Sequence, residues 1–376
     1  MHPQVQVKEV SNRKELREFV RLPLRLYHSD PNWVPPLWRQ EQRSFTAAGN
    51  ALLSGSEYCL LLALSKNGTT LGRLLVFIQK GFNRYYNEQI GFVGCLEVIP
   101  ELEVAARLLA TGCQWLKDRG MERVRGPIHQ YSEVWGFVCE GYDVPPVFLS
   151  PYNPPYYNDF MEALGFAKVK DLLVYEADAK KNYLLPSRFV RFGESYLKRH
   201  PQFKLRPLNL RCLEEDARHI WRISNEALAG NWGYVPVAEE ELKDLIKALK
   251  ILIDPDAVWF VEKEGKPIGY CLGFPDLNVV LKKCGGKLFP RGLFELAFRR
   301  QAIKNYRLFG LAVLPPFQGQ GLDVLLYLRL YEALKPKGIR LEANYILEDN
   351  FRMRNPLEKL NLKLVKKYRI YEKALS

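Results

Sequence analysis

The same order of predicted strands and helices occurs twice along the sequence. This repeat limits the folds that the chain can adopt. A short strand leads into a helix at Asn12–Tyr27, and a second such strand leads into a helix at Leu213–Ala229. Each helix is followed by a hairpin, with turns at Asn67-Gly68 and around Gly265. A strand, a helix and another strand come next in both halves. We therefore expect two copies of one α/β fold.

The repeat divides the 376 residues into two domains. We expect the first at 1–180, a connector with a helix at Ser187–Arg199 spanning 181–201, and the second at 202–376. Hydrophobic residues make up 47% of the chain, enough for a large core. Gly/Pro-rich insertions lie at different places in the halves, around 126–155 and 276–305. Such insertions are expected to form surface loops.

Charge separates the two halves. Residues 1–180 hold 20 basic and 20 acidic residues, whereas 181–376 hold 35 and 22, so the formal charge of +13 lies in the second half. An anionic partner is expected there. No apolar run approaches the length of a membrane span, and the N-terminus is polar, which predicts a cytoplasmic protein without a signal peptide. Seven scattered Cys without a CxxC pair and five scattered His predict no metal site.

The segment most informative about chemistry is FGLAVLPPFQGQGLDVLLYLRLYEALKPKG. An apolar strand, Leu308–Val313, ends before Pro315-Pro316, and the turn Gln318–Gly321 opens a helix at Leu322–Lys335. Backbone N–H groups at such a turn point at an anion, the helix dipole favours negative charge, and glycine permits close approach. The segment predicts a phosphate-binding cradle.

With these residues the sequence resembles the GNAT acyltransferase superfamily. Gln318 and Gly321 take the first and fourth places of its Arg/Gln-x-x-Gly-x-Gly/Ala motif, and Asp323 stands at the sixth. Downstream, Asn350 and Met353 match the family's closing helix. The repeat extends the resemblance to the topology of the first half. The stretches DPNWVPPL, LGRLLVFI, GNWGYVP and YRIYEK are similar to those of bacterial N-acetyltransferase-like proteins. The resemblance implies two tandem GNAT-like domains, each a mixed, mostly antiparallel sheet flanked by helices.

The resemblance also implies a co-substrate, acetyl-CoA or another acyl-CoA, and direct attack by an amine within a ternary complex. The backbone of Leu311, Ala312 and Val313 would pair with pantetheine, and Asn350 and Met353 would lie beside it. The pyrophosphate would be held by Gln318, Gly319, Gln320, Gly321, Leu322 and Asp323. The first half lacks the glycine turn and carries Glu101 and Glu103 there, so we expect it not to bind the cofactor.

Acid and base groups are less clearly marked. Leu357 stands where many family members have a tyrosine that protonates the departing thiolate, so Tyr345 is the substitute candidate. Glu342 and Glu348 are the candidate bases. Tyr345 can instead be a packed aromatic, and Glu348 can be part of a helix cap. For the acceptor pocket, the resemblance suggests Asn231, Trp232 and Asp276.

The leading hypothesis is an acyl-CoA-dependent N-acyltransferase acting on a small-molecule amine, with its active unit in the second half. Two alternatives stay open. An aminoacyl-tRNA-dependent transferase of similar tandem fold would suit the basic second half, although the intact Gln318–Gly321 turn argues against it. A non-catalytic CoA-binding module is kept open by Leu357. The acceptor, the acyl length and the oligomeric state do not follow from the sequence.

Overall fold

The computed structural model describes residues 5–131, 134–239, 242, 246, 253–287 and 303–375. The chain forms two compact units. Unit 1 comprises Met1–Leu172, Asn278–Phe298 and Lys366–Ser376, and unit 2 comprises Leu173–Leu277 and Arg299–Val365. These units differ from the expected division at 181–201, because the chain enters each unit more than once.

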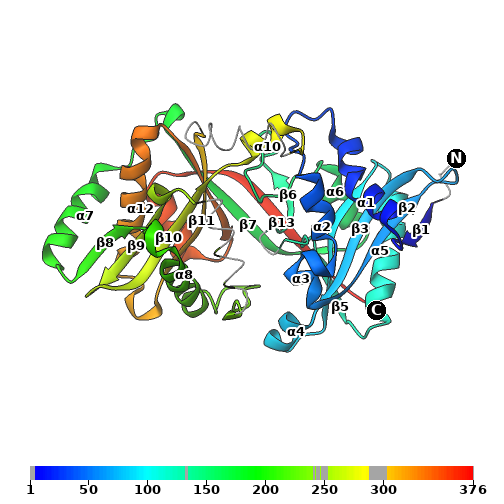
Figure 1. Ribbon diagram of the computed structural model, residues 1–376, viewed down its shortest axis with the longest axis horizontal. Coiled ribbons are helices and arrows are strands. Elements are labelled where there is room, and N and C mark those ends of the chain that lie inside the picture. Colours follow the sequence, from blue (N-terminus) through cyan, green and yellow to red (C-terminus); the bar gives the residue numbers. More distant parts are fainter. Residues whose placement is uncertain are drawn as a thin grey trace. The chain divides into compact units, whose positions relative to one another are not determined.

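The sheet of unit 1 has the strand order β1-β2-β3-β4-β5-β13, and β6 also pairs with β13 (Figure 1). Its neighbours are antiparallel except β4 and β5, which are parallel. The strands are β1 (Gln6–Glu9), β2 (Ser56–Leu64), β3 (Thr70–Gln79), β4 (Ile90–Val98), β5 (Arg123–Gly126), β6 (Phe137–Glu140) and the later part of β13 (Lys363–Ala374). The helices are α1 (Arg13–Tyr27), α2 (Trp38–Ser44), α3 (Ala51–Ser54), α4 (Lys80–Tyr86), α5 (Leu102–Lys117), α6 (Tyr156–Ala163) and α10 (Asn278–Cys284).

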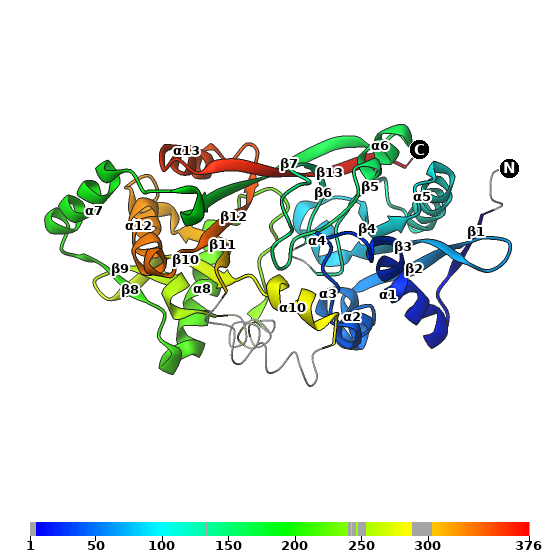
Figure 2. The ribbon, with the colours of Figure 1, turned by 90° about the horizontal axis from the view of Figure 1, so that it is seen from above.

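Helices α1 and α5 cover opposite faces of this sheet, as Figure 2 shows. Neighbouring strand residues point to opposite faces. On β3, the Arg73 guanidinium donates to the carbonyl of Phe19 on α1, whereas the Leu74 side chain faces Gly112 on α5. Helix α1 begins where Asn12 caps it, accepting from the backbone N–H groups of the next turn. The core of unit 1 therefore has two layers of helix around one sheet.

The sheet of unit 2 has the order β7-β12-β11-β10-β9-β8. Strands β8 to β11 pair antiparallel, and β11 and β12 are parallel. The strands are the later part of β7 (Ala167–Asp178), β8 (Phe203–Pro207), β9 (Val258–Lys263), β10 (Lys266–Pro275), β11 (Asn305–Val313) and β12 (Arg340–Leu347). The helices are α7 (Ser187–Arg199), α8 (Leu213–Ala227), α12 (Leu322–Leu334) and α13 (Phe351–Lys359).

Helices α8 and α12 lie on opposite faces of the unit 2 sheet. On β10, the Tyr270 hydroxyl shares a 2.7 Å hydrogen bond with Ser224 on α8. The next residue, Cys271, directs its thiol to the Leu326 carbonyl on α12 at 3.9 Å. Because adjacent strand residues alternate between faces, the two helices cover different faces.

The predicted repeat is confirmed by the two sheets. Each unit has a run of antiparallel strands that ends in one parallel pair, β4/β5 or β11/β12. A helix, α5 or α12, connects the two parallel strands along the chain. This mixed, mostly antiparallel α/β architecture is the expected fold class.

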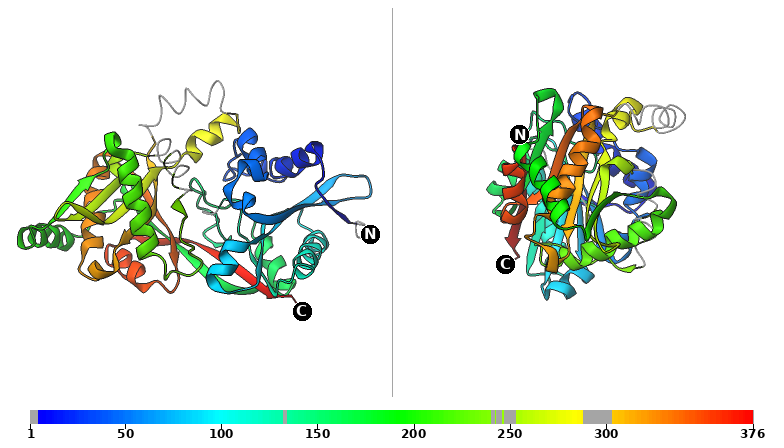
Figure 3. Two further views of the ribbon diagram at one scale, coloured as in Figure 1. Left: turned by 60° about the horizontal axis from the view of Figure 1, so that its bottom comes forward. Right: turned by 90° about the vertical axis from the view of Figure 1, so that its left-hand side faces the viewer.

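The last strand of each half contributes to the other half's unit. Leu173–Asp178 of β7 belong to unit 2, where β7 neighbours β12. Lys366–Ala374 of β13 belong to unit 1 and pair with β5 and β6. The left view of Figure 3 shows this strand, in red, running to the C-terminus. The insertion of the second half likewise joins unit 1, where the indole N–H of Trp38 donates to the Gly285 carbonyl. Residues 288–302 of that insertion lie outside the described residues.

Candidate functional site

A groove opens where the parallel strands of unit 2 separate. β11 and β12 are paired from Asn305↔Arg340 to Leu308↔Ala343, and the pairing stops there. Beside this point β11 has a bulge at Phe309, since Leu308 and Gly310 pair with successive residues of β10. Beyond it the strands line a groove of about 890 Å³. Its walls come from Leu308–Val313, Ala343–Leu347, the turn before α12, the first turns of α13 and the segment after α8.

Glycines shape the turn at the mouth of this groove. Gly319 has φ 74° and Gly321 has φ 81°, a left-handed conformation that disfavours other residues. Gly321 is the N-cap of α12, and a Cβ added to it would meet the Phe192 ring at 2.7 Å. The first turn of a helix leaves backbone N–H groups without helical partners. The turn therefore offers an anion both N–H groups and the positive end of a helix dipole.

Gln318 ties three elements together at this turn. Its Nε2 donates to the Val313 carbonyl at 2.9 Å, and its Oε1 accepts from the Arg352 guanidinium at 2.9 Å. Arg352 and Lys359, both on α13, line the groove and add positive charge to it. Sequence reasoning missed these two cations, although their place in the helix after Asn350 could have suggested them. The mouth of the groove is thus cationic and donor-rich.

Asp323, at the unexpected sixth motif position, lies in the first turn of α12 and lines the groove. Burial raises the pKa of its carboxyl, while backbone hydrogen bonds from Asp323 and Val324 partly oppose this. Burial therefore favours the neutral form. A neutral carboxyl repels a neighbouring phosphate less than a carboxylate does.

Asn350 and Met353 line the groove. Asn350 is the N-cap of α13, and its side chain accepts from the Met353 backbone N–H at 3.2 Å. Leu357 lies on the same helix but is fully buried in the core of unit 2. Leu357, where the resemblance implied a tyrosine, therefore packs inward.

Of the three predicted acid and base residues, Tyr345 lines the groove. The Arg307 guanidinium lies 5.2 Å from its ring and 5.2 Å from that of Phe309. Glu342 has no exposed surface and forms an ion pair with Arg340, which also pairs with Glu176 at 2.6 Å. Glu342 is thus outside the groove lining, in a buried charge network.

Glu348 is also outside the lining, and its backbone carbonyl accepts from the Arg354 guanidinium at 2.6 Å. Among the described residues, the side chains that line the groove and can carry or release a proton are Asp323, Tyr345, Arg352 and Lys359. This set makes Tyr345 the proton-transfer candidate nearest the splay of the strands.

The segment after α8 forms the opposite wall of the groove. Asn231 lines it, together with Ala227, Leu228 and Gly230. The following loop is held to α8 by Asn225, whose side chain donates to and accepts from the backbone of Val237 at 2.9 Å. Trp232 and Asp276 are not among the lining residues, and Asp276 is buried after β10 with its N–H on the Asn305 carbonyl.

In unit 1 the equivalent separation of β4 and β5 is filled by the chain itself. The two strands pair from Ile90↔Arg123 to Phe92↔Arg125, after which the Ile128 N–H donates to the Val93 carbonyl at 2.9 Å. A Cβ added to Gly94 would lie 1.8 Å from the Ile128 oxygen. We call residues 127–130 the plug.

The plug is held by a buried polar cluster. The Cys95 thiol donates to Gln130 at 3.0 Å, and Gln130 and Tyr131 donate to the Glu41 carboxylate at 2.9 and 3.0 Å. Helix α5 begins after Glu101, at φ −129°, with Glu103 in its first turn. Unit 1 thus lacks both the open splay and a glycine turn at this helix.

Every helix among the described residues is too short or too polar to span a membrane. Those residues contain no group of three His, Cys, Asp or Glu side chains placed to hold a metal ion. The seven cysteines are free of disulfides.

Comparison with known proteins agrees with this geometry. Residues 216–361 match the model of the acetyltransferase (GNAT) family. Protein YghO of Escherichia coli is 28% identical over 98% of this chain and 95% of its own. A bacterial ceramide synthase of Caulobacter vibrioides is 29% identical, over 96% of this chain and 95% of its own.

Solved structures match over nearly the whole chain. A tandem GNAT protein from the clavulanic acid biosynthesis pathway has a TM-score of 0.59 at 13% identity and covers 99% of both chains. A GCN5-related N-acetyltransferase from Sphaerobacter thermophilus has a TM-score of 0.54 at 13% identity, over 99% of this chain and 96% of its own. Residues 216–361 are therefore similar to the acetyltransferase (GNAT) family, and the chain as a whole has the fold of a tandem GNAT protein.

Proposed function

We propose that unit 2 binds an acyl-CoA in the groove between β11 and β12 and transfers the acyl group to an amine. The observation that carries this proposal is the combination of an open splay with the turn Gln318–Asp323 at its mouth. A pyrophosphate at this turn would meet the N-terminal end of α12 and the Arg352 guanidinium. The pantetheine arm would then run along Leu311–Val313, with Asn350 and Met353 beside it.

The reaction needs correct placement of two reactants. The amine nitrogen attacks the thioester carbonyl carbon, a C–N bond forms, and the C–S bond breaks to release CoA as a thiolate. The bulge at Phe309 frees β11 backbone from ladder pairing next to the expected thioester, which suits polarisation of its carbonyl. Alignment of amine and thioester would supply most of the acceleration.

Protons move in two steps. The amine loses one on attack, and the departing thiolate gains one. Tyr345 is our candidate donor to the thiolate, since it is the hydroxyl-bearing side chain among the described lining residues. Glu348 and Glu342 remain candidate bases only through an intervening water, because neither lines the groove. The buried pair with Arg340 makes Glu342 the weaker of the two candidates.

The acceptor would enter from the wall after α8, where Asn231 lies. A ceramide is an amide of a long-chain amino alcohol, so the name of the Caulobacter relative adds amines with apolar tails to the acceptors worth testing. Small soluble amines form the other class.

Calorimetric titration with CoA and acetyl-CoA tests the proposal first. We expect saturable binding with one site per chain and a Kd within about 1 μM to 1 mM, the usual range of substrate affinities. A screen of amines that follows free thiol release then tests transfer. Absence of binding at millimolar CoA would overturn the proposal. Binding without thiol release for any acceptor would favour a non-catalytic CoA-binding module.

A further inference from the structure

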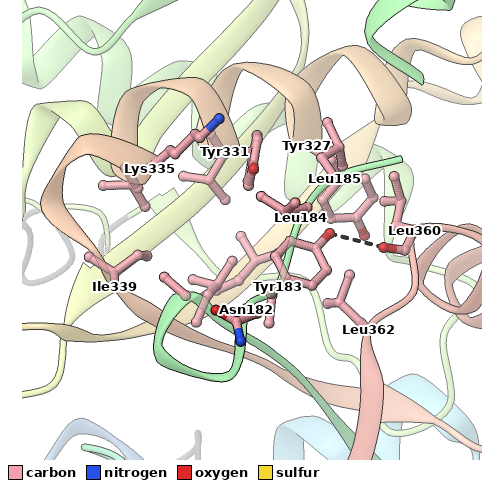
Figure 4. Close-up of a pocket in the computed structure, with 16 residues that line it drawn as sticks. Asn182, Tyr183, Leu184, Leu185, Tyr327, Tyr331, Lys335, Ile339, Leu360 and Leu362 are labelled. Carbon is pink, nitrogen blue, oxygen red and sulfur yellow. Dashed lines mark hydrogen bonds between the residues drawn. The ribbon is translucent and has the colours of Figure 1, made fainter. Parts of the chain in front are cut away.

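Unit 2 contains a second cavity, of about 320 Å³, beside the C-terminal half of α12. We call it the α12 pocket (Figure 4). Its lining is apolar apart from a few side chains at its ends. The residues are Ala177, Ala179, Asn182–Leu185, Leu308, Tyr327, Leu330, Tyr331, Leu334, Lys335, Ile339, Leu341, Leu360 and Leu362.

The polar atoms of the pocket are arranged to leave its interior apolar. The Tyr183 hydroxyl is engaged by the Leu360 carbonyl at 2.9 Å, as Figure 4 shows, so its ring faces the cavity. Lys335 is exposed and lies over the Tyr331 ring, with 5.6 Å between its Nζ and the ring centre. Leu184 is 67% exposed, which leaves apolar surface at the rim for a ligand to cover.

We propose that the α12 pocket holds the hydrocarbon chain of a fatty acyl-CoA. This inference rests on the proposed function of the groove, and it gives the donor a chemical class. Leu308 lines both cavities. Leu308 is also the last β11 residue paired with β12, next to the bulge at Phe309. A chain that continues past the thioester toward the closed end of the splay reaches this residue.

Helix α12 contributes lining residues to both cavities. Asp323, in its first turn, lines the groove, and Tyr327, one turn later, lines the α12 pocket. The Tyr327 hydroxyl is buried without a hydrogen-bond partner among the described residues. Buried hydroxyls are usually satisfied, so this one suits a ligand that brings an acceptor, such as a carbonyl oxygen, to the head of the chain.

The pocket is assigned to the donor because of the face on which it lies. Helix α12, whose N-terminus would hold the pyrophosphate, lines the pocket and covers one face of the sheet. The proposed acceptor wall follows α8, on the other face, as the contacts of Tyr270 and Cys271 establish. The tail of an amine entering from the α8 side would have to cross the sheet to reach the pocket.

The test is a titration of the full chain with CoA, acetyl-CoA, octanoyl-CoA and dodecanoyl-CoA below their micelle concentrations. Each buried methylene should tighten binding about fourfold, so dodecanoyl-CoA should bind at least 100-fold more tightly than acetyl-CoA. Ala177→Phe, which fills the pocket, should remove this gain and leave the affinity for CoA unchanged. Ala106→Phe, in an apolar pocket of unit 1, is the matched control and should keep the gain.

The outcomes separate the two proposals. CoA binding whose strength does not depend on chain length overturns the pocket assignment and leaves the groove intact, whereas absence of CoA binding overturns the groove itself. A gain with long-chain amines and none with long-chain acyl-CoA assigns the pocket to the acceptor and overturns the donor assignment. If Ala177→Phe does not fold, a dodecanoyl-CoA with a photoreactive group at its chain end decides the matter in the unmodified protein. It should label α12 or Asn182–Leu185, and labelling confined to the α8 side would contradict the proposal.

Discussion

In each unit the pairing of the two parallel strands stops at an equivalent position. The space between the separated strands is open in unit 2 and filled in unit 1. In unit 2 the pairing of β11 and β12 stops at Leu308↔Ala343, and a groove of about 890 Å³ follows. In unit 1 the pairing of β4 and β5 stops at Phe92↔Arg125, and the plug continues to bond to β4. The same fold thus forms a candidate ligand site in unit 2 and a filled core in unit 1.

The difference teaches that two features must occur together for a site of this kind. The gap between the separated strands stays open only if no other backbone segment fills it. A phosphate can bind only at a turn whose backbone N–H groups approach it closely. Unit 2 has both, in the groove and in Gly321. Unit 1 has neither, because the plug fills its splay and Glu101 precedes its helix. Each feature can be altered separately.

The largest effect should come from Gly321→Val. The left-handed backbone and the nearby Phe192 ring both oppose a side chain there, so the turn must move. We expect CoA affinity to fall more than 100-fold by calorimetry. Glu103→Gln, in the first turn of α5 in unit 1, is the matched control and should leave it unchanged. Equal losses in the two variants would show that the units do not differ as described.

Tyr345→Phe should lower kcat by about 100-fold if its hydroxyl supplies the thiolate proton. The KM for acyl-CoA should change little, because the ring stays against Arg307. The measurement is steady-state thiol release with an active amine. Retention of most of the kcat would show that the thiolate leaves without this hydroxyl, and would assign Tyr345 a packing role.

Glycines at matching places in β4 and β11 should respond differently to alanine. In Gly94→Ala the new Cβ collides with the Ile128 oxygen of the plug, and we expect unit 1 to lose about 2–3 kcal/mol of stability. In Gly310→Ala the Cβ meets the Tyr270 hydroxyl at 3.3 Å, a contact that needs only a small shift, so the loss should stay below about 1 kcal/mol. Denaturant unfolding compares them, and equal losses would argue against the plug.

Arg352→Ala should weaken CoA binding by about tenfold, since it removes a charge-assisted contact at the turn. The residue is exposed, so the effect should shrink as ionic strength rises. Calorimetry at low and high salt measures this. A salt-independent loss would indicate that Arg352 acts by holding Gln318 and not by its charge.

The smallest effect should be an opposite pH response of two buried glutamates. Burial raises the pKa of Glu41 in unit 1, so its proton is bound more tightly in the folded state. Burial would also raise the pKa of Glu176 in unit 2, but Lys181 and Arg340 outweigh it and lower this pKa. As pH falls toward about 4.5, the ordinary pKa of a glutamate, protonation of Glu41 therefore increases the free energy of unfolding. Glu176 loses its contribution as pH falls below that value.

Glutamine variants isolate these contributions. The free energy of unfolding of the unmodified protein minus that of Glu41→Gln should rise as pH falls. The same difference for Glu176→Gln should decrease. Thermal unfolding over a pH series measures both slopes. Slopes of the same sign would contradict the assignment of Glu41 to a plug-holding network that disfavours its charge.

Local patterns in the sequence were enough to predict the repeat, most helices and the glycine turn. The helix at Ser187–Arg199 is found with those bounds, and the predicted helix at Leu322–Lys335 ends one residue earlier. These features depend on neighbouring residues. The plug, by contrast, depends on a pairing between Ile128 and Val93, which are distant in the sequence, whereas the local pattern at 126–155 predicts a surface loop.

The sequence also does not predict which individual side chains are buried. Glu342 has a side chain that could act as a base. In the structure, however, it pairs with Arg307 in the strand register and forms an ion pair with Arg340, so it is a core residue. The exchange of β7 and β13 between the units also involves pairings that no local pattern encodes. Arg352 and Lys359 reach the groove because α13 begins at its edge, which the sequence order alone does not reveal.

Hydrogen exchange with and without saturating CoA tests the central claim most directly, because it reports on both splays in one experiment. We predict protection at Leu308–Val313, at Gln318–Asp323 and in the first turn of α13, with no change at Ile90–Val98 or in the plug. Protection at β4 and the plug, with none at Gln318–Asp323, would contradict the account.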